Sequence, residues 1–436
     1  MAKIAFIGAG SFTFTRDLVR DILSYPAFSD ATIALMDINE ERLSYIKKAI
    51  DNIVESGKYS ARVVATMDRI EALKGADGVV TTILTGDVEV WRHDLEIPAR
   101  YGVNFQIGDT RGPSGIFRAL RTIPIMFDIC KDIERYCPNA VLLNYSNPMA
   151  MLCRAMQGYT KVNITGLCHS VQLTAEMLAK WIGIPLNEIT YLCAGINHQA
   201  WYLEFKWNGC DAYPLIKEAA RRPENYEAEK VRNEMLFHLD YYVTESSTHN
   251  SEYNPWFRKR RDLMEKYCNY KSGKAMMDRI KWYTERKTEY SNIIQKWIKE
   301  PVDLKRGHEY AACIFNALFG DGTMYEFNGN VRNFGLIDNL RTGCCVEVPI
   351  LASKRGLSPM HVGSLPEHLA ILNDVNARCE ELAVEGAVHS DPRAIFHAVC
   401  MDPLTSSILS LDEIQKMVDE MFEINKEWLP QFKYLR

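Results

Sequence analysis

The sequence predicts an α/β fold, with a parallel-sheet domain of the dinucleotide-binding kind followed by a second, mixed α+β domain. Short apolar runs alternate with amphipathic helical patterns over the first third of the chain. A glycine turn, Gly8-Ala9-Gly10-Ser11, follows the first of these runs. The chain has 436 residues, 47% of them hydrophobic, which is enough for two interlocked domains. Alternating strands and helices imply a parallel sheet with helices on both faces.

Several glycine and polar residues lie at the carboxyl ends of the predicted strands. Ligands of parallel sheets bind beyond the carboxyl ends of the strands. Gly8, Asp37, Gly86, residues 144–147 and Cys168 all stand at such ends, which predicts one shared site. The expected strands are 3–7, 31–36, 78–84, 140–143 and 164–167, and the expected helices are 12–23 and 40–54.

The pattern changes after about residue 192. Longer charged helical stretches appear, with a Gly- and Asn-rich segment at 328–335 between them. No flexible linker separates the two parts, so the second is expected to pack directly against the first. We predict a dinucleotide-binding domain at 1–195 and an α+β domain for substrate, metal and oligomerisation at 196–436. Helices of this second part are expected at 227–241, 276–299, 366–386 and 410–426.

Bulk properties favour a cytoplasmic enzyme. The net charge of −5 provides no basic surface, so nucleic acid is not an expected partner. No apolar run approaches the roughly 18 residues that cross a bilayer, and the start lacks a signal-peptide pattern, so no membrane association is expected. The twelve cysteines follow no framework spacing, and Cys130, Cys153 and Cys193 lie in apolar segments. Reduced, mostly buried thiols are therefore predicted.

The glycine turn predicts a cofactor site of the Rossmann-like type. It follows a strand and opens a helix, so the backbone can approach a pyrophosphate at a helix N-terminus. Asp37 ends the second strand, where a carboxylate accepts hydrogen bonds from a ribose diol and favours NAD over NADP. The alternative is an ordinary helix cap after a strand. The candidate cofactor-binding residues are Gly8, Gly10, Ser11, Phe12, Thr13 and Asp37.

Cys168 and His198 are candidate metal ligands. Cys168-His169 follows a buried strand, and either residue alone would be interpreted as a core residue. His198 lies in Gly195-Ile196-Asn197-His198, where polar residues interrupt an apolar strand pattern. A thiolate and an imidazole suit a borderline divalent metal such as Mn²⁺, Co²⁺ or Ni²⁺, with positions left for substrate oxygens.

Three polar segments remain as possible substrate contacts. Asn147 precedes Pro148, and this proline is expected in the first turn of a helix. The side chain of Asn147 could bind a sugar or the cofactor, or serve as a helix cap. The glycine-rich loop 108–121 could be a lid with Asp109 or Arg118 as contacts, or a plain surface loop. Residues 244–256 include Tyr253, and a solvated surface loop is the favoured interpretation of that segment.

Together these motifs resemble glycoside hydrolase family four, the NAD- and metal-dependent glycosidases, whose fold resembles lactate and malate dehydrogenases. The resemblance covers nearly the whole chain. Cys168-His169-Ser170-Val171 resembles the motif of α-galactosidases that act on melibiose-type sugars, whereas phospho-glycosidases usually carry an acidic residue or Asn after the Cys, and Pro at the fourth position. The related α-glucosidases tend to have Glu in place of Ser170. The motifs concerned are GAGSFTFT, GDTRGPSGIFRALR, NYSNPMAM, GLCHSV, GINH and VEVP.

The resemblance implies a redox-assisted glycosidase. NAD would oxidise the sugar at C3, a base would remove the C2 proton, the leaving group would depart from C1, and water addition and re-reduction would follow. Two-carboxylate hydrolysis is the usual route, to which NAD-dependent members of this kind are exceptions. By the same resemblance Cys168 and His198 hold Mn²⁺, His169 (or a metal-bound water) protonates the leaving oxygen, and Tyr253 is the base, with Tyr241 and Tyr242 as weaker candidates. Asn147 and Asp109, singled out above from their own segments, are the candidate substrate contacts.

Alternatives within the family are an α-glucosidase and an α-galacturonidase, and family precedent predicts a homodimer or homotetramer. An NAD-dependent 2-hydroxy acid dehydrogenase could use the same fold, but it would consume NAD and would not need Cys168. A non-catalytic NAD-binding sensor is a third interpretation. It would tolerate replacement of Cys168 and His198.

Overall fold

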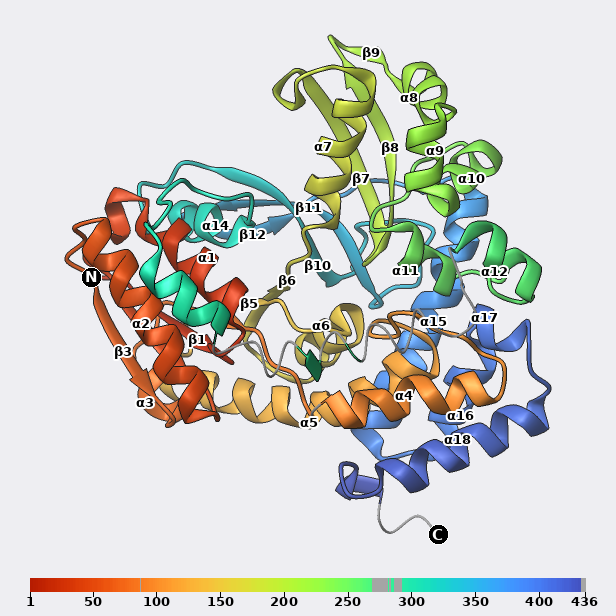
Figure 1. The fold of residues 1–436 in the computed structure, drawn as a ribbon, viewed down its shortest axis with the longest axis horizontal. Coiled ribbons are helices and arrows are strands. Elements are labelled where there is room, and N and C mark those ends of the chain that lie inside the picture. The colour runs from red at the N-terminus through yellow and green to blue at the C-terminus, as the bar shows by residue number, and fades with distance from the viewer. Residues whose placement is uncertain (87, 269–280, 282–283, 286–291, 433–436) are drawn as a thin grey trace.

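The computed structural model describes residues 1–86, 88–268, 281, 284–285 and 292–432. Within these residues, twelve strands form one sheet that runs through the molecule (Figure 1). The first six are β1 (Lys3–Ile7), β2 (Thr32–Met36), β3 (Arg62–Thr66), β4 (Gly78–Thr81), β5 (Val141–Asn144) and β6 (Asn163–Gly166). The others are β7 (Ile189–Ile196), β8 (Gln199–Trp207), β9 (Cys210–Asp211), β10 (Tyr325–Arg332), β11 (Cys345–Ser353) and β12 (Gly356–Pro359).

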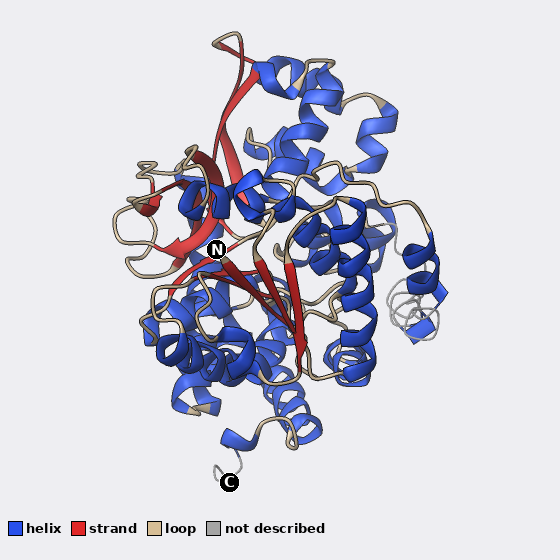
Figure 2. Ribbon diagram, turned by 90° about the vertical axis from the view of Figure 1, so that its left-hand side faces the viewer, coloured by secondary structure: helices blue, strands red, loops and turns tan. Residues whose placement is uncertain are grey.

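The first six strands form the parallel part of the sheet. Their order is β3-β2-β1-β4-β5-β6, and each pairs in parallel with its neighbour. This is the order of dinucleotide-binding folds made of two strand–helix halves. The α/β fold class predicted from the sequence is therefore confirmed, and Figure 2 shows helices on both sides of these strands.

Helices cover both faces of the parallel strands, which explains why these strands are uninterrupted apolar runs. In β1, Ile4 and Phe6 pack into one core, together with the helices at residues 12–23, 40–56 and 310–319. Ala5 and Ile7 pack into a second core, together with the helices at 69–73, 112–136, 149–159, 367–389, 392–401 and 411–425. The helices of the first half are α1 (Phe12–Leu23), α2 (Glu40–Ser56), α3 (Arg69–Leu73), α4 (Val88–Arg100), α5 (Gly112–Tyr136), α6 (Met149–Tyr159) and α7 (Ser170–Ile182).

The second half continues the same sheet with antiparallel strands. β10 meets β6 at Asn330 and Gly166, and β11 meets β7 at Glu347 and Gly195. The division at residue 195 stays a prediction; β7, which contains it, pairs with β8 and β11. The later helices are α8 (Tyr213–Ala220), α9 (Pro223–Ala228), α10 (Lys230–Leu239), α11 (Ser247–Glu252), α12 (Arg261–Tyr267), α14 (Tyr310–Phe319), α15 (Glu367–His389), α16 (Pro392–Met401), α17 (Pro403–Ser406) and α18 (Leu411–Asn425).

Some predicted boundaries differ from the structure. The strand expected at 78–84 ends at Thr81, because its neighbours β1 and β5 also end opposite that residue and offer no partners beyond it. The helix expected at 227–241 is two helices, α9 and α10, separated at Glu229, whose φ of −134° is not helical. Most of the helix expected at 276–299 lies outside the described residues, but 292–299 are helical.

Among the residues that the structure describes, no helix combines the length and the apolar character that crossing a bilayer requires.

Candidate active site

The turn between β1 and α1 has the close backbone packing expected of a cofactor-binding turn. Gly8 has a φ of +87°, and a Cβ there would lie 2.7 Å from the carbonyl oxygen of Thr82. The backbone N–H groups of Gly8 and Ala9 donate to the Met36 carbonyl at the end of β2, at 2.9 Å each. Glycine at position 8 is therefore required by both conformation and space.

Asp37 lies directly against this turn. Its Oδ2 accepts a hydrogen bond from the Gly10 N–H at 2.7 Å, and its Oδ1 accepts one from the Asn39 N–H at 2.9 Å. The Ser11 side chain precedes α1 and makes no capping hydrogen bond to it. The Phe12 ring stacks on Trp297 with centroids 5.0 Å apart. Thr13 belongs to α1, and its side chain is outside the described part.

Three potential metal ligands meet beside the other half of the sheet. One ligand atom from each of Cys168, His198 and Glu245 lies within 4.8 Å of the other two. Cys168 follows β6, His198 occupies the tight turn between β7 and β8, and Glu245 precedes α11. The structure thus places Cys168 and His198 in one cluster, and their role as metal ligands stays a prediction. Glu245 is a member that sequence reasoning missed.

The imidazole of His198 is oriented by contacts to its inner nitrogen. Nδ1 lies 3.2 Å from the Thr110 hydroxyl and 3.2 Å from the Tyr253 hydroxyl. Nε2 faces the opposite way, 3.6 Å from Oε2 of Glu245. Burial lowers the pKa of His198 to about 4, so the ring is neutral near pH 7. A neutral imidazole with one nitrogen held and the other directed at a cluster is the form that binds metal ions.

Arg111 supports both this turn and Tyr253. Its Nη2 donates to the carbonyl of Asn197 at 2.6 Å, and its Nε donates to Glu380 at 2.8 Å. The guanidinium also lies over the Tyr253 ring, 4.5 Å from the centroid. Arg118 of the same loop was a predicted contact, and Arg111 was not predicted, because no local sequence pattern distinguishes the two arginines.

Asp109 and Asn147, the expected substrate contacts, are neighbours. The Asn147 amide donates to Asp109 at 3.4 Å. His249 lies between two carboxylates, with Nε2 3.7 Å from Asp109 and Nδ1 3.1 Å from Glu245. Burial alone would lower the pKa of His249, but the two carboxylates outweigh it and raise this pKa to about 10. A buried imidazolium therefore joins the metal-ligand cluster to the predicted substrate contacts.

His169 and Tyr253, the expected catalytic residues, differ in exposure. His169 precedes α7 with its side chain 44% exposed, and Nδ1 lies 3.6 Å from Glu309, whose hydrogen bond raises the pKa of the imidazole. Tyr253 is 1% exposed, and burial raises the pKa of its phenol well above the usual value. Its hydroxyl is held at His198 in this structure. Both catalytic roles stay predictions.

The segment 244–253 is not the solvated surface loop that the sequence favoured. Thr244, Asn250 and Ser251 are fully buried, and residues 247–252 form α11. The polar side chains are satisfied internally, as in the bond that Asn250 donates to the Thr244 carbonyl at 2.8 Å. Such internal pairing lets a polar sequence be buried without a large penalty.

The glycine-rich loop 108–121 is also buried rather than a plain surface loop. Thr110 and Arg111 are 2% and 3% exposed, and α5 begins at Gly112. Glu252 at the end of α11 accepts hydrogen bonds from the backbone N–H groups of residues 106–108, at 2.6 to 3.0 Å. This carboxylate fastens the loop to α11. Pro148 lies just outside α6, which begins at Met149, one residue later than the sequence predicted.

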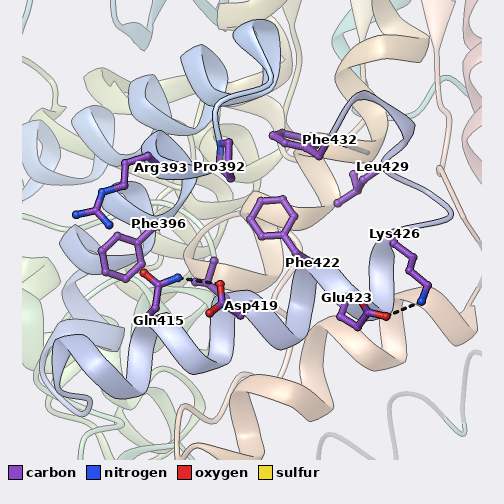
Figure 3. A pocket seen from close by; sticks show the side chains of 11 residues that line it. Pro392, Arg393, Phe396, Gln415, Asp419, Phe422, Glu423, Lys426, Leu429 and Phe432 are labelled. Atoms are coloured by element: carbon purple, nitrogen blue, oxygen red, sulfur yellow. Dashed lines mark hydrogen bonds and ion pairs between the residues drawn. The ribbon is translucent and has the colours of Figure 1, made fainter. Parts of the chain in front are cut away.

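A groove of about 640 Å³ lies elsewhere, between α16 and α18 (Figure 3). Its lining combines the rings of Phe396, Phe422 and Phe432 with the ion pair of Lys426 and Glu423. None of the candidate site residues named above lines this groove. It therefore does not belong to the candidate active site.

Comparison with known proteins identifies relatives over nearly the whole length of the chain. The closely similar relatives include an α-galactosidase of Bacillus subtilis (strain 168), 39% identical over 99% of this chain and 100% of that protein. An α-galactosidase of Rhizobium meliloti (strain 1021) is 36% identical over 99% of this chain and 90% of its own. An α-galacturonidase of Thermoanaerobacter italicus is 28% identical over 98% of this chain and 97% of that protein.

A crystal structure of a 6-phospho-α-glucosidase from gut microorganisms, in complex with NAD and Mn²⁺, has the same fold. It superimposes with a TM-score of 0.82 at 20% identity, over 99% of this chain and 100% of that one. Residues 3–184 match the model of family 4 glycosyl hydrolases, and residues 193–405 match the model of their C-terminal domain. The chain belongs to the family 4 glycosyl hydrolases.

Proposed function

We propose that this protein is an NAD- and divalent-metal-dependent α-galactosidase that hydrolyses terminal α-galactosides of the melibiose type. The observation that carries the proposal is the cluster of Cys168 and His198 at strand ends of the sheet that also bears the Gly8 turn. A dinucleotide turn and a thiolate–imidazole pair on one sheet suit redox chemistry at a sugar hydroxyl. The similarity to α-galactosidases at 36% and 39% identity supports the substrate class.

The residues of the β1–α1 turn fit NAD. The space at Gly10 is a cradle that a Cβ would fill, since such an atom would lie 2.7 Å from Asp37 Oδ2. The N-terminus of α1, which the Ser11 side chain does not cap, suits a pyrophosphate. The Asp37 carboxylate would bind the ribose diol. Gly8, Gly10, Ser11, Phe12, Thr13 and Asp37 remain the proposed cofactor-binding residues.

The buried cluster fits a divalent metal, Mn²⁺ by resemblance to the family. Cys168 offers sulfur and His198 offers a neutral ring nitrogen, a donor set that borderline divalent ions accept. When bound, NAD would accept and return a hydride, and the metal would polarise the oxidised sugar so that its neighbouring C–H becomes acidic.

Residues of the chain would move the protons. Tyr253 is the proposed base for the sugar C2 proton, and its hydroxyl must leave Nδ1 of His198 to reach a sugar carbon. His169 is the proposed acid for the departing oxygen; its pairing with Glu309 keeps it protonated at higher pH. Asp109 and Asn147 are proposed to bind sugar hydroxyls. Burial opposes ionisation of Asp109, but the hydrogen bond and charge of His249 hold the pKa of this carboxyl below its usual range, so it is an acceptor.

The alternatives differ in substrate or in cofactor use. An α-glucosidase or α-galacturonidase would share the site, and the lower identity to the α-galacturonidase, 28%, disfavours that substrate. A 2-hydroxy acid dehydrogenase would accumulate NADH. The expected homodimer or homotetramer and the cytoplasmic location stay predictions.

The test incubates the protein with a panel of nitrophenyl α-glycosides, catalytic NAD, Mn²⁺ and a thiol reductant, and measures release of nitrophenol and formation of NADH. We expect turnover of the α-galactoside without net NADH, and loss of turnover with EDTA. Run in D₂O, the recovered galactose should carry deuterium at C2, because the C2 proton is removed and replaced. Unlabelled sugar from an active reaction would exclude proton abstraction at C2, and stoichiometric NADH would favour the dehydrogenase.

A further inference from the structure

We propose that Glu245 is a third protein ligand of the divalent metal, completing a Cys168–His198–Glu245 site. This inference rests on the proposed function, because it concerns the metal of that same site. The sequence motifs assign the metal to a cysteine and a histidine. The geometry around Glu245 adds a carboxylate from a segment that the motifs do not include.

The spacing of the three groups suits one ion. Atoms that each bind a metal at about 2.0–2.3 Å lie roughly 3 to 4.5 Å from one another. Oε2 of Glu245 lies 3.6 Å from Nε2 of His198, and one ligand atom of each of the three residues lies within 4.8 Å of the others. The groups therefore surround one point without needing to move far.

Partners on the side away from the metal position determine which atoms of Glu245 and His198 face that position. Oε1 of Glu245 lies 3.1 Å from His249 Nδ1, which leaves Oε2 directed at the cluster. Nδ1 of His198 is likewise held by Thr110 and Tyr253, which leaves Nε2. Ligands with one atom fixed by an outer partner and the other free for the metal are typical of protein metal sites.

The backbone conformation of two members is a second, independent observation. His198 has a φ of 62° and Glu245 a φ of 66°, and neither residue is glycine. Residues other than glycine adopt this left-handed region uncommonly, and Asn, Asp and His do so more often than the rest, so the conformation of Glu245 is the less expected of the two. Such strain persists where the surroundings impose it, often at functional sites. Here both strained residues direct their side chains at the same place, which a purely structural loop would not require.

Charge balance favours the third ligand. A thiolate and a carboxylate together neutralise a divalent cation, whereas Cys168 and His198 alone would leave one positive charge in a buried site. The remaining partner of Glu245, His249, is itself paired with Asp109, so its charge is already balanced. The alternative is that Glu245 only pairs with His249.

The test measures metal binding by the full-length protein without NAD or sugar. Equilibrium dialysis gives the Mn²⁺ affinity, and the visible absorption of Co²⁺ reports the ligand set. We expect Glu245→Gln to weaken Mn²⁺ binding by about 10- to 100-fold and to change the Co²⁺ spectrum, while Glu245→Asp retains part of the affinity. NAD affinity measured in the same variants checks that the fold is intact.

Glu229→Gln is the matched control. Its side chain is 17% exposed, against 16% for Glu245, and it pairs with Arg232 and Ser247 rather than with the cluster. This variant should bind both metals like the wild type. Wild-type Mn²⁺ affinity and an unchanged Co²⁺ spectrum in Glu245→Gln would overturn the proposal and leave the proposed function standing.

A crystal of the Mn²⁺-loaded wild type decides the question even if the variants misfold. An oxygen of Glu245 within about 2.2 Å of the ion would establish the ligand, and a separation beyond about 3 Å would overturn it. Absence of Mn²⁺ binding to the wild type would instead refute the metal dependence in the proposed function. The two failures are therefore distinguishable.

Discussion

The cofactor half and the metal half of the candidate site are assembled in different ways. The proposed cofactor residues lie in the turn after β1, in the first turn of α1 and directly after β2, the strand next to β1. The cluster of Cys168, His198 and Glu245 comes from three separated segments, which meet through antiparallel strands and α11. The first half depends on local backbone geometry. The second depends on tertiary packing.

The two halves also differ in what holds them together. The β1–α1 turn is held by backbone hydrogen bonds and by the absence of side chains at Gly8 and Gly10. The metal half is held by buried charged groups, among them Arg111 with Glu380. Substitutions in one half should therefore leave ligand binding by the other half largely intact, which can be tested.

The largest expected effect is loss of activity on replacing a proposed metal ligand. Cys168→Ser should lower kcat/KM for a nitrophenyl α-galactoside by about 10³-fold or more, because a metal that polarises the substrate contributes several kcal/mol. NAD affinity, followed by protein fluorescence, should stay within about twofold of the wild type. Retained activity with intact metal binding would show that Cys168 is only a buried core thiol.

The second largest expected effect is a loss of stability of the metal half in Arg111→Met. The substitution leaves Glu380 buried without its cation, and breaking such a pair from one side costs about 3–5 kcal/mol. Urea unfolding measures this loss. The double variant Arg111→Met/Glu380→Gln is the control and should recover part of the stability, since no uncompensated charge remains. Equal stability of the single and double variants would contradict the assignment of the cost to Glu380.

These differences explain what could be predicted from the sequence. The turn at Gly8 and Asp37 is encoded within one strand–helix–strand unit, so pattern and spacing were sufficient. Cys168 could be placed at a strand end for the same reason. That Cys168 lies beside His198 depends on β10 and β11 inserting between β6 and β7, which no local pattern specifies.

Glu245 could not be predicted for a related reason. Its segment is polar, and polarity alone indicates a surface loop. The segment instead packs into the protein, half-buried at 245–249 and buried at 250–254, because Glu252 binds the backbone of residues 106–108 and Asn250 closes the turn at Thr244. The dense run of hydroxyl, amide and carboxyl groups in 244–253 was the available signal, since such groups can satisfy one another inside the protein.

The stability of the metal half should also depend on pH through Glu347. This residue is on β11 and pairs with Gly195 on β7. Burial, reinforced by the charge of Glu245, raises the pKa of Glu347 to about 8. Between the ordinary pKa of 4.5 and about 8, the folded protein keeps a proton that the unfolded chain releases, so the stability of the metal-free wild type falls as pH rises through this window. Glu347→Gln should match the wild type near pH 5 and exceed it by a few kcal/mol above pH 8.

Urea unfolding in EDTA at pH 5 and at pH 8.5 checks this difference. Glu326→Gln, an exposed carboxyl on the adjacent strand β10, is the control and should leave the pH dependence unchanged. The same pH dependence in Glu347→Gln as in the wild type would mean that another group titrates in this window.

The smallest expected effect lies in the cofactor half. A Cβ in Gly10→Ala would lie 2.7 Å from Oδ2 of Asp37 and 3.0 Å from Cβ of Arg42, so the carboxylate must shift away from the turn. We expect NAD affinity to fall about 10- to 100-fold, equivalent to roughly 1.4–2.7 kcal/mol, while Mn²⁺ affinity stays at the wild-type value. Because the clash involves a side-chain carboxylate that can move, the loss should be smaller than that of Cys168→Ser. A parallel loss of Mn²⁺ affinity would show that the two halves are coupled through the sheet. Ligand binding by the two halves would then not be independent.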